Sequence, residues 1–142
     1  MKLALGLEVY NKAVLDLPIE AIETAERYGY HSVWTAEAYG SDALSTLAYL
    51  AGKTTTIKLG TAVVQVAART PASTAMAAMT IDALAGGDRT IIGLGVSGPQ
   101  IVEGWYGQPW GSPHHWLRDY VKKKRKIFAR QEPVTHIGKQ LN

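Results

Sequence analysis

The stretch Arg89-Thr-Ile-Ile-Gly-Leu-Gly-Val-Ser-Gly-Pro-Gln100 decides the fold. It reads as an apolar strand that runs into a Gly-rich loop, and it belongs to the fourth of four strand-then-helix units in the 142-residue chain. Such alternation predicts a parallel sheet with right-handed crossovers. Glycines inside three of the four strands favour strong curvature, and hence a barrel over a doubly wound sheet. We therefore expect an α/β fold that is half of a (β/α)8 TIM barrel, which in full takes about 250 residues.

The four expected strands are almost continuously apolar, which is typical of parallel strands that are buried on both faces. They cover residues 3–9, 31–37, 57–64 and 90–96, and the helices cover 19–28, 42–51, 71–85 and 113–130. We expect the third strand to run on as far as Thr70. The roughly 16 residues after Val96 form a long irregular loop, and such loops are usually functional. No linker interrupts the pattern, so residues 1–142 are predicted to form a single domain.

The composition is that of an ordinary globular protein, with 46% hydrophobic and 19% charged residues. The chain has no Cys, which excludes a disulfide framework and thiolate chemistry. The apolar run Leu3–Leu7 is too short for a signal peptide or a membrane span. We therefore expect a cytoplasmic protein with no membrane partner.

Five consecutive basic residues, Lys122–Lys126, stand in the last expected helix. Such a run can contact nucleic acid, or it can be the solvated face of a helix. We favour the solvated face and expect no nucleic-acid partner, because no aromatic residues interleave with the charges. Within the run, Lys124 occupies a position where the helical period calls for an apolar residue.

Two other motifs carry weaker signals. Residues 93–98 match the pattern G-x-G-x-x-G of dinucleotide sites, in which the last Gly opens a helix. Here Pro99 and a turn-rich loop follow, so the dinucleotide interpretation is the weaker alternative. The pair His114-His115 has only Asp119 as a further ligand at helical spacing, so we predict a polar helix start and no metal.

Polar residues follow the expected strands at the ends where barrels carry their active sites. Glu37 comes after the second strand and is either a site carboxylate or a surface acid that faces the loop. Thr61 and Gln65 stand near the end of the third strand. The loop after the fourth strand carries Gln100 and Glu103 among aromatic residues, which either face a flat ring or pack on one another.

A further set of runs covers nearly the whole chain in order. These are Ser32-Val-Trp-Thr-Ala-Glu37, Lys58-Leu-Gly-Thr-Ala-Val63, Arg69-Thr-Pro71, Asp82-Ala-Leu84 with Gly86-Gly87, and residues 93–100 with Glu103-Gly-Trp105. In sequence and spacing they resemble the bacterial luciferase-like monooxygenase superfamily. They are most similar to its branch that uses the deazaflavin coenzyme F-420.

The resemblance implies a TIM barrel with coenzyme F-420, or alternatively FMN, lying across the rim at the carboxyl ends of the strands. It also implies a bulge in the third strand with a non-proline cis peptide near Ala62-Val63 that backs the ring. Glu37 and Glu103 would be the catalytic residues, whereas Ala38 stands where some deazaflavin members carry His. The coenzyme-binding residues that the resemblance implies are Thr61, Ala62, Val63, Gln65, Ser97, Gly98 and Gln100.

The expected function is that of a fragment of a flavin- or deazaflavin-dependent oxidoreductase, with hydride transfer at the ring and a small organic substrate. The alternative is a catalytically silent half-barrel that acts as a structural or assembly module. Because half of the rim is absent, we expect weak coenzyme binding and slow or no turnover. Four strands also leave an apolar inner face and two sheet edges uncovered, which predicts a homodimer or larger assembly. Candidates for the inner face are Leu5, Val33, Ala62, Ile92 and Leu94 and their neighbours, whichever alternate set points inward.

Overall fold

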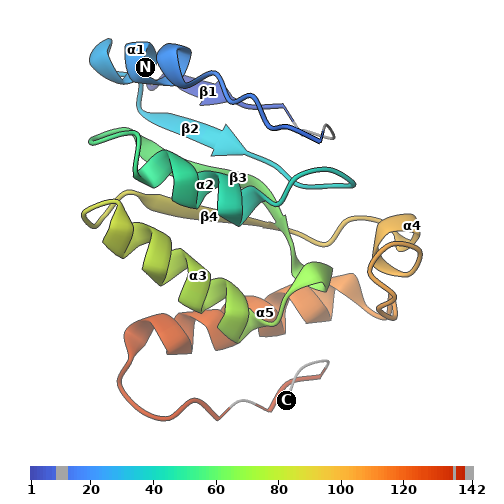
Figure 1. Cartoon of the computed structure of the whole chain (residues 1–142). Helices are drawn as coiled ribbons and strands as arrows, with labels where there is room; N and C mark the ends of the chain where they lie inside the picture. Colours follow the sequence, from blue (N-terminus) through green and yellow to red (C-terminus); the bar gives the residue numbers. More distant parts are fainter. Residues whose placement is uncertain (9–12, 136, 140–142) are drawn as a thin grey trace. The chain divides into compact units, whose positions relative to one another are not determined.

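Strands and helices alternate along the chain, as the sequence predicts (Figure 1). The structure is a computed structural model that describes residues 1–8, 13–135 and 137–139. Val9, which we expected to end the first strand, lies outside the described residues. In chain order the elements are β1 (Ala4–Gly6), α1 (Ile19–Arg27), β2 (Ser32–Thr35), α2 (Ala43–Ala51), β3 (Lys58–Gln65), the 3-10 helix η1 (Val66–Ala68), α3 (Pro71–Leu84), β4 (Thr90–Gly95), α4 (Pro99–Val102) and α5 (Pro113–Ala129).

The strands form one parallel sheet in the order β1-β2-β3-β4. Val33 is the register partner of Leu5 on one side and of Leu59 on the other. One residue further along, Trp34 pairs with Gly6 and Gly60. The predicted topology is thereby confirmed: the chain consists of four βα units of the kind that make up half of a (β/α)8 barrel.

The chain divides into two compact units, which we describe separately. The first unit comprises Met1–Val64 and Ala78–Gly93, and the second comprises Gln65–Ala77 and Leu94–Asn142. Helix α3 and strand β4 therefore contribute residues to both units. The single domain of residues 1–142 stays a prediction.

The core of the first unit lies between the sheet and helices α1 and α2. Val33 and Leu59 are fully buried on one face of the sheet, together with Ile22 of α1 and Leu47 of α2. Thr35 lies on the same face as Val33, and its hydroxyl donates to the carbonyl of Ala43 at the start of α2. The α1–α2 layer therefore covers this face of β2 and β3. Val33 and its register partner Leu5 belong to the covered face, which corrects their inclusion among the inner-face candidates.

The amino ends of β3 and β4 are fixed by charged side chains. Glu26 Oε1 accepts from the amides of Thr55, Thr56 and Ile57, at 2.5 to 2.8 Å. The buried Arg89 guanidinium donates to the carbonyls of Ile57, Thr54 and Ala85, each at 3.0 Å. These bonds satisfy amide and carbonyl groups of the backbone at the ends of the strands and helices.

The core of the second unit is built around Tyr120 of α5. Its side chain is fully buried, and its hydroxyl lies 2.5 Å from Thr74 Oγ1 and donates to the carbonyl of Thr70 at 3.2 Å. Val66 and Val102 are buried in the same unit. Lys124 follows Tyr120 by one turn and is also buried, with its ammonium 5.6 Å from the centre of the Phe128 ring.

Two local expectations were wrong. Strand β3 ends at Gln65, and the chain then turns into η1 instead of continuing as a strand to Thr70. The loop after β4 is not wholly irregular, because residues 99–102 form the short helix α4. Ile101 and Val102 are buried, so this turn of helix forms because it places two apolar side chains in the core of the second unit.

None of the helices in the part of the chain that the structure describes is long and apolar enough to cross a membrane.

Candidate functional site

The side chain of Thr61 locks β3 to β4 near the middle of both strands. Thr61 is fully buried, and its hydroxyl donates to the carbonyl of Gly93 at 2.9 Å and accepts from the amide of Gly93 at 3.0 Å. A Cβ at position 93 would lie 2.2 Å from the carbonyl oxygen of Thr61. Gly93 is therefore present because the two backbones approach each other too closely for any side chain.

The residues after Thr61 carry the backbone feature that the family resemblance implies. The peptide bond between Ala62 and Val63 is cis, as expected. Ala62 is exposed although it stands in a central strand, whereas Thr61 and Val64 on either side of the pair are buried. Strand β3 thus presents a small, open patch of backbone and methyl group at Ala62.

Glycine is also required beside this patch, at position 60. The ring of Trp34 lies over Gly60, and a Cβ there would come within 2.4 Å of the ring. The indole N–H of Trp34 donates to the hydroxyl of Ser32 at 2.8 Å, which fixes the orientation of the ring. The face of the sheet opposite α1 and α2 therefore carries the half-buried Trp34, while Ala4 and Gly6 of β1 are exposed.

Glu37 lies two residues beyond the end of β2 and is only 6% exposed. Its Oε2 accepts from the amide of Ala43, the first residue of α2, at 3.1 Å. The cap residue Asp42 accepts from the amide of Ser45 at 2.6 Å. Two carboxylates therefore serve the amino end of α2, where negative charge is stabilised by the helix dipole. Glu37 is therefore not a surface acid, and its part in the site stays a prediction.

The second unit holds the site residues that follow β4. Ser97 adopts a left-handed conformation, with φ of 56°. A Cβ on Gly98 would lie 2.6 Å from Gln100 Oε1, so the Gln100 amide folds back over Gly98. Glu103 is exposed, and its Oε1 accepts from the amide of Trp110 at 3.2 Å, which closes the loop between them.

Gly93 and Gly98 have local roles in the strand and in the loop that follows it. Gly93 allows the contact with Thr61, and Gly98 precedes α4, which has four residues and begins with Pro99. A dinucleotide fingerprint needs a long helix whose free amino end faces the pyrophosphate. Such a helix does not follow Gly98 in the described chain.

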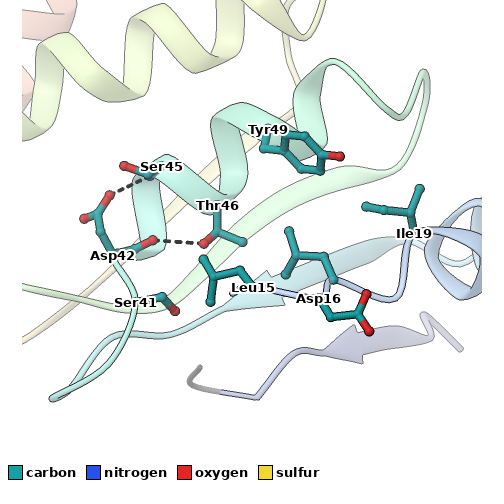
Figure 2. A pocket seen from close by; sticks show the side chains of 9 residues that line it. Leu15, Asp16, Ile19, Ser41, Asp42, Ser45, Thr46 and Tyr49 are labelled. Atoms are coloured by element: carbon teal, nitrogen blue, oxygen red, sulfur yellow. Dashed lines mark hydrogen bonds between the residues drawn. The ribbon is translucent and has the colours of Figure 1, made fainter. Parts of the chain in front are cut away.

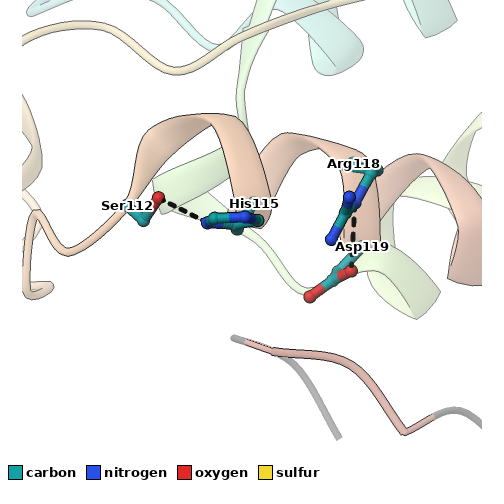
Figure 3. Close-up of polar contacts among 4 residues, drawn as sticks. All are labelled: Ser112, His115, Arg118 and Asp119. Carbon is teal, nitrogen blue, oxygen red and sulfur yellow. Dashed lines mark hydrogen bonds and ion pairs between the residues drawn. The ribbon is translucent and has the colours of Figure 1, made fainter.

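The histidine pair lies at the start of α5, as predicted. His115 Nδ1 lies 2.8 Å from the hydroxyl of Ser112, the residue before the helix (Figure 3). Asp119 lies one turn of α5 beyond His115 and is buried. Its Oδ1 lies 4.0 Å from Nε of the neighbouring Arg118 (Figure 3). Among the described residues, no three His, Asp or Glu side chains are grouped closely enough to hold a metal ion.

The structure thus gathers the predicted residues in two sets, one in each unit. In the first unit, Thr61 pairs with Thr35 across the sheet, and Glu37 follows Thr35 by two residues. Ala62 and Val63 adjoin them in the chain. In the second unit, Ser97, Gly98 and Gln100 are in contact or adjacent, whereas Glu103 turns to Trp110. Gln65 is buried at the end of β3.

Sequence analysis missed a pocket in the first unit, between residues 15–19 and one face of α2. The signal for it was available. Asp42, Ser45, Thr46 and Tyr49 recur at helical spacing and mark a polar face of that helix.

Comparison with known proteins agrees with the family resemblance. Residues 6–142 match the family model described as luciferase-like monooxygenase. A protein of Mycobacterium tuberculosis, named as a candidate coenzyme F-420-dependent oxidoreductase, is 48% identical over 138 residues. That match covers 97% of this chain and 40% of the relative. The chain therefore spans well under half the length of this relative.

Solved structures with the same fold include enzymes of both coenzyme types. The coenzyme F-420-dependent tetrahydromethanopterin reductase of Methanopyrus kandleri matches with a TM-score of 0.76 and 24% identity, over 97% of this chain and 43% of the reductase chain. The oxygenating constituent of 3,6-diketocamphane monooxygenase from Pseudomonas putida, solved with FMN, matches with a TM-score of 0.79 and 20% identity, over 98% of this chain and 42% of its own. At this identity the likeness concerns the fold.

Proposed function

Because the chain belongs to the luciferase-like monooxygenase family, we propose that it forms part of an oxidoreductase site for coenzyme F-420, with FMN as the alternative, and a small organic substrate. Such a ring takes up or gives a hydride when it is bound. The exposed Ala62 in the carboxyl-terminal half of β3 carries the proposal. A small apolar surface at the carboxyl end of a parallel strand is where a flat ring can pack.

The neighbouring residues hold this surface in place. The two hydrogen bonds between Thr61 and Gly93 fix β3 against β4, and the buried Val64 anchors the strand after the patch. Ala62 has only a methyl group, so the ring can approach the backbone. We assign Thr61, Ala62 and Val63 to coenzyme binding, together with Gln65.

The polar residues of the two units have different parts in the proposal. Glu37 is the carboxylate that polarises the bound molecule or carries a proton, and its bond to the Ala43 amide orients it. We also assign Ser97, Gly98 and Gln100 of the second unit to coenzyme binding, as the family resemblance implies. Glu103 is the second proposed catalytic carboxylate, although its bond to Trp110 also gives it a role in shaping the loop.

Coenzyme retention on ultrafiltration tests the proposal. We expect the chain to retain coenzyme F-420 or FMN with a dissociation constant weaker than about 1 µM, because it spans only 40% of its relative. Ala62→Leu should weaken retention about tenfold by covering the patch. Ala72→Leu places the same side chain at an exposed position of α3 and should leave retention unchanged. Equal retention by both variants, or none by the unaltered chain, would contradict the assignment.

Assembly into a homodimer or larger complex is part of the same proposal. Its support is the open side of β1, where Ala4 and Gly6 are exposed, and the half-buried Trp34 on the adjoining strand. Uncovered sheet surface and an unpaired strand edge favour association. A catalytically silent assembly module remains the second candidate, favoured by the use of Glu37 as a helix cap. Light scattering after size exclusion reports the assembly, and turnover with added coenzyme separates the two candidates.

A further inference from the structure

A pocket of about 560 Å³ opens in the first unit, away from the residues assigned to the coenzyme (Figure 2). One wall is the segment before α1, with Leu15 and Leu17, together with Ile19, the first residue of α1. The other wall is the start of α2. Figure 2 shows the Leu15 side chain directed toward the first turn of α2. The volume falls within the range of about 300–1,000 Å³ that is usual for small-molecule sites.

The α2 wall is a continuous helical face with hydrogen-bonding groups. Ser45 and Tyr49 are four residues apart, so they lie one above the other on this face, and both are exposed. Thr46 also lines the pocket, and its hydroxyl donates to the carbonyl of Asp42 at 3.0 Å. The opposite side of α2 carries the buried Leu47 and Leu50. The pocket wall can therefore be altered at Ser45 without a change in the core.

The chemistry of the lining selects the kind of ligand. Leu15, Leu17 and Ile19, with the Tyr49 ring, offer apolar surface for a compact hydrophobic body. The Ser45 and Tyr49 hydroxyls can hydrogen-bond to a single polar group. Among the described residues that line the pocket, the charged ones are Asp16 and Asp42. An anion would meet the like charges of these two carboxylates there.

We propose that this pocket is a second binding site, for a small molecule that has an apolar, ring-sized body and one hydroxyl or amino group and carries no negative charge. The site is separate from the proposed coenzyme site, since none of the residues assigned to the coenzyme lines it. The two proposals stand or fall independently.

Ligand-observed NMR on the full chain, without coenzyme, tests the site with three probes that share a ring: benzyl alcohol, benzylamine and benzoate. We expect saturation transfer from the protein to benzyl alcohol and benzylamine and little to benzoate. Ser45→Trp should abolish the transfer, because the new ring fills the pocket. Ser73→Trp makes the same change at an exposed position of α3 outside the pocket and should leave the transfer intact.

A second variant keeps the test decisive if Ser45→Trp does not fold. Leu15→Asn removes apolar surface from the other wall at a residue that is 44% exposed, and should weaken binding of benzyl alcohol about tenfold. The proposal is overturned if benzoate binds as well as benzyl alcohol, if no probe binds, or if folded Ser45→Trp and Leu15→Asn chains bind like the unaltered one.

Discussion

Thr61 and Gly93 exchange two hydrogen bonds through a single hydroxyl, which donates to the carbonyl of Gly93 at 2.9 Å and accepts from its amide at 3.0 Å. The hydroxyl is buried, so water cannot replace either bond. Because Ala62 follows directly, this pair determines where the exposed patch of β3 stands relative to β4.

Replacing Thr61 by Val tests the strength of this link. Val keeps the shape of the side chain but leaves the Gly93 amide without its hydroxyl acceptor. Loss of a buried hydrogen-bond partner costs about 1–3 kcal/mol, so we expect the free energy of unfolding to fall by that amount in urea titrations. Thr55→Val changes the same group at an exposed position and should stay within about 0.5 kcal/mol. Equal effects of the two variants would mean that the hydroxyl contributes nothing.

Gly93→Ala should destabilise the chain more than an equivalent change elsewhere in the sheet. The new Cβ would lie 2.2 Å from the carbonyl oxygen of Thr61, and this backbone atom cannot move without shifting β3. Overpacking of this kind costs about 1–3 kcal/mol or more. Gly6→Ala is the matched control, because nothing lies within 4 Å of a Cβ at that strand position. Thermal unfolding of both variants makes the comparison; a similar loss at both sites would refute the close approach.

Acid should weaken the fold through Glu26 and Asp82. Burial alone would raise the pKa of each carboxyl, but amide donors outweigh it and lower both pKa values: Ile57, Thr56 and Thr55 for Glu26, and Thr90, Arg89 and Asp88 for Asp82. A carboxyl whose folded pKa is lowered contributes stability above its unfolded pKa, and that stability is lost as the pH falls through the folded pKa.

We therefore expect the free energy of unfolding to decline below the ordinary values of 4.5 for Glu26 and 3.8 for Asp82. Glu26→Gln should be less stable at pH 7 and should show a shallower decline in acid. Glu8→Gln, at an exposed position, should follow the unaltered chain. Urea titrations between pH 7 and pH 3 measure this. If the free energy of unfolding of Glu26→Gln declined in acid as steeply as that of the unaltered chain, the lowered pKa of Glu26 would not contribute to the pH dependence.

Two substitutions separate the structural and chemical roles of Glu37. Glu37→Gln retains an oxygen that can accept from the Ala43 amide, whereas Glu37→Ala removes it. Leaving a buried backbone amide without its acceptor costs about 1–3 kcal/mol, so only Glu37→Ala should lower the unfolding free energy by that amount. If Glu37 carries a proton in the proposed reaction, Glu37→Gln should abolish any measurable turnover while it keeps stability. Full turnover of a stable Glu37→Gln chain would mean that Glu37 carries no proton and serves only as an acceptor at the start of α2.

The sequence predicted the elements with a strong periodic pattern and failed where a local contact overrode the pattern. The sequence offered Ser41 or Asp42 as the cap of α2, and Asp42 is the one that accepts from the amide of Ser45. The predicted end of β3 was too late. Val66 is apolar and is buried in the 3-10 helix η1, but an apolar residue at this position would be equally typical of a buried strand. Periodicity cannot distinguish these two structures over so short a run.

The candidate site was predictable to the extent that it depends on residue types next to one another in the chain. The cis bond at Ala62–Val63 came from the family resemblance, because nothing in the local sequence distinguishes the two isomers. The contact of Glu37 with Ala43 was not foreseen, since it depends on how the loop between them folds back. The pocket beside α2 was not foreseen either, because it forms only when residues 15–19 and α2 lie next to each other in the folded chain.

Lys124 should oppose folding at neutral pH. Burial lowers its pKa, and the neighbouring charge of Arg125 lowers it further. A lysine whose folded pKa is lowered costs stability below that pKa, and the cost disappears as the pH rises toward its ordinary value of 10.5. The contact with Phe128, at 5.6 Å, offsets only part of this cost, since such contacts are worth about 0.5–1 kcal/mol.

Lys124→Met keeps the length of the stem and removes the charge, so we expect a gain of about 0.5–1 kcal/mol at pH 7 and a smaller gain at pH 10. Lys122→Met makes the same change at an exposed position of α5 and should give no gain. Urea unfolding of the three chains at both pH values decides the matter. A loss of stability in Lys124→Met at pH 7 would mean that the ammonium is held by its surroundings more strongly than burial disfavours it.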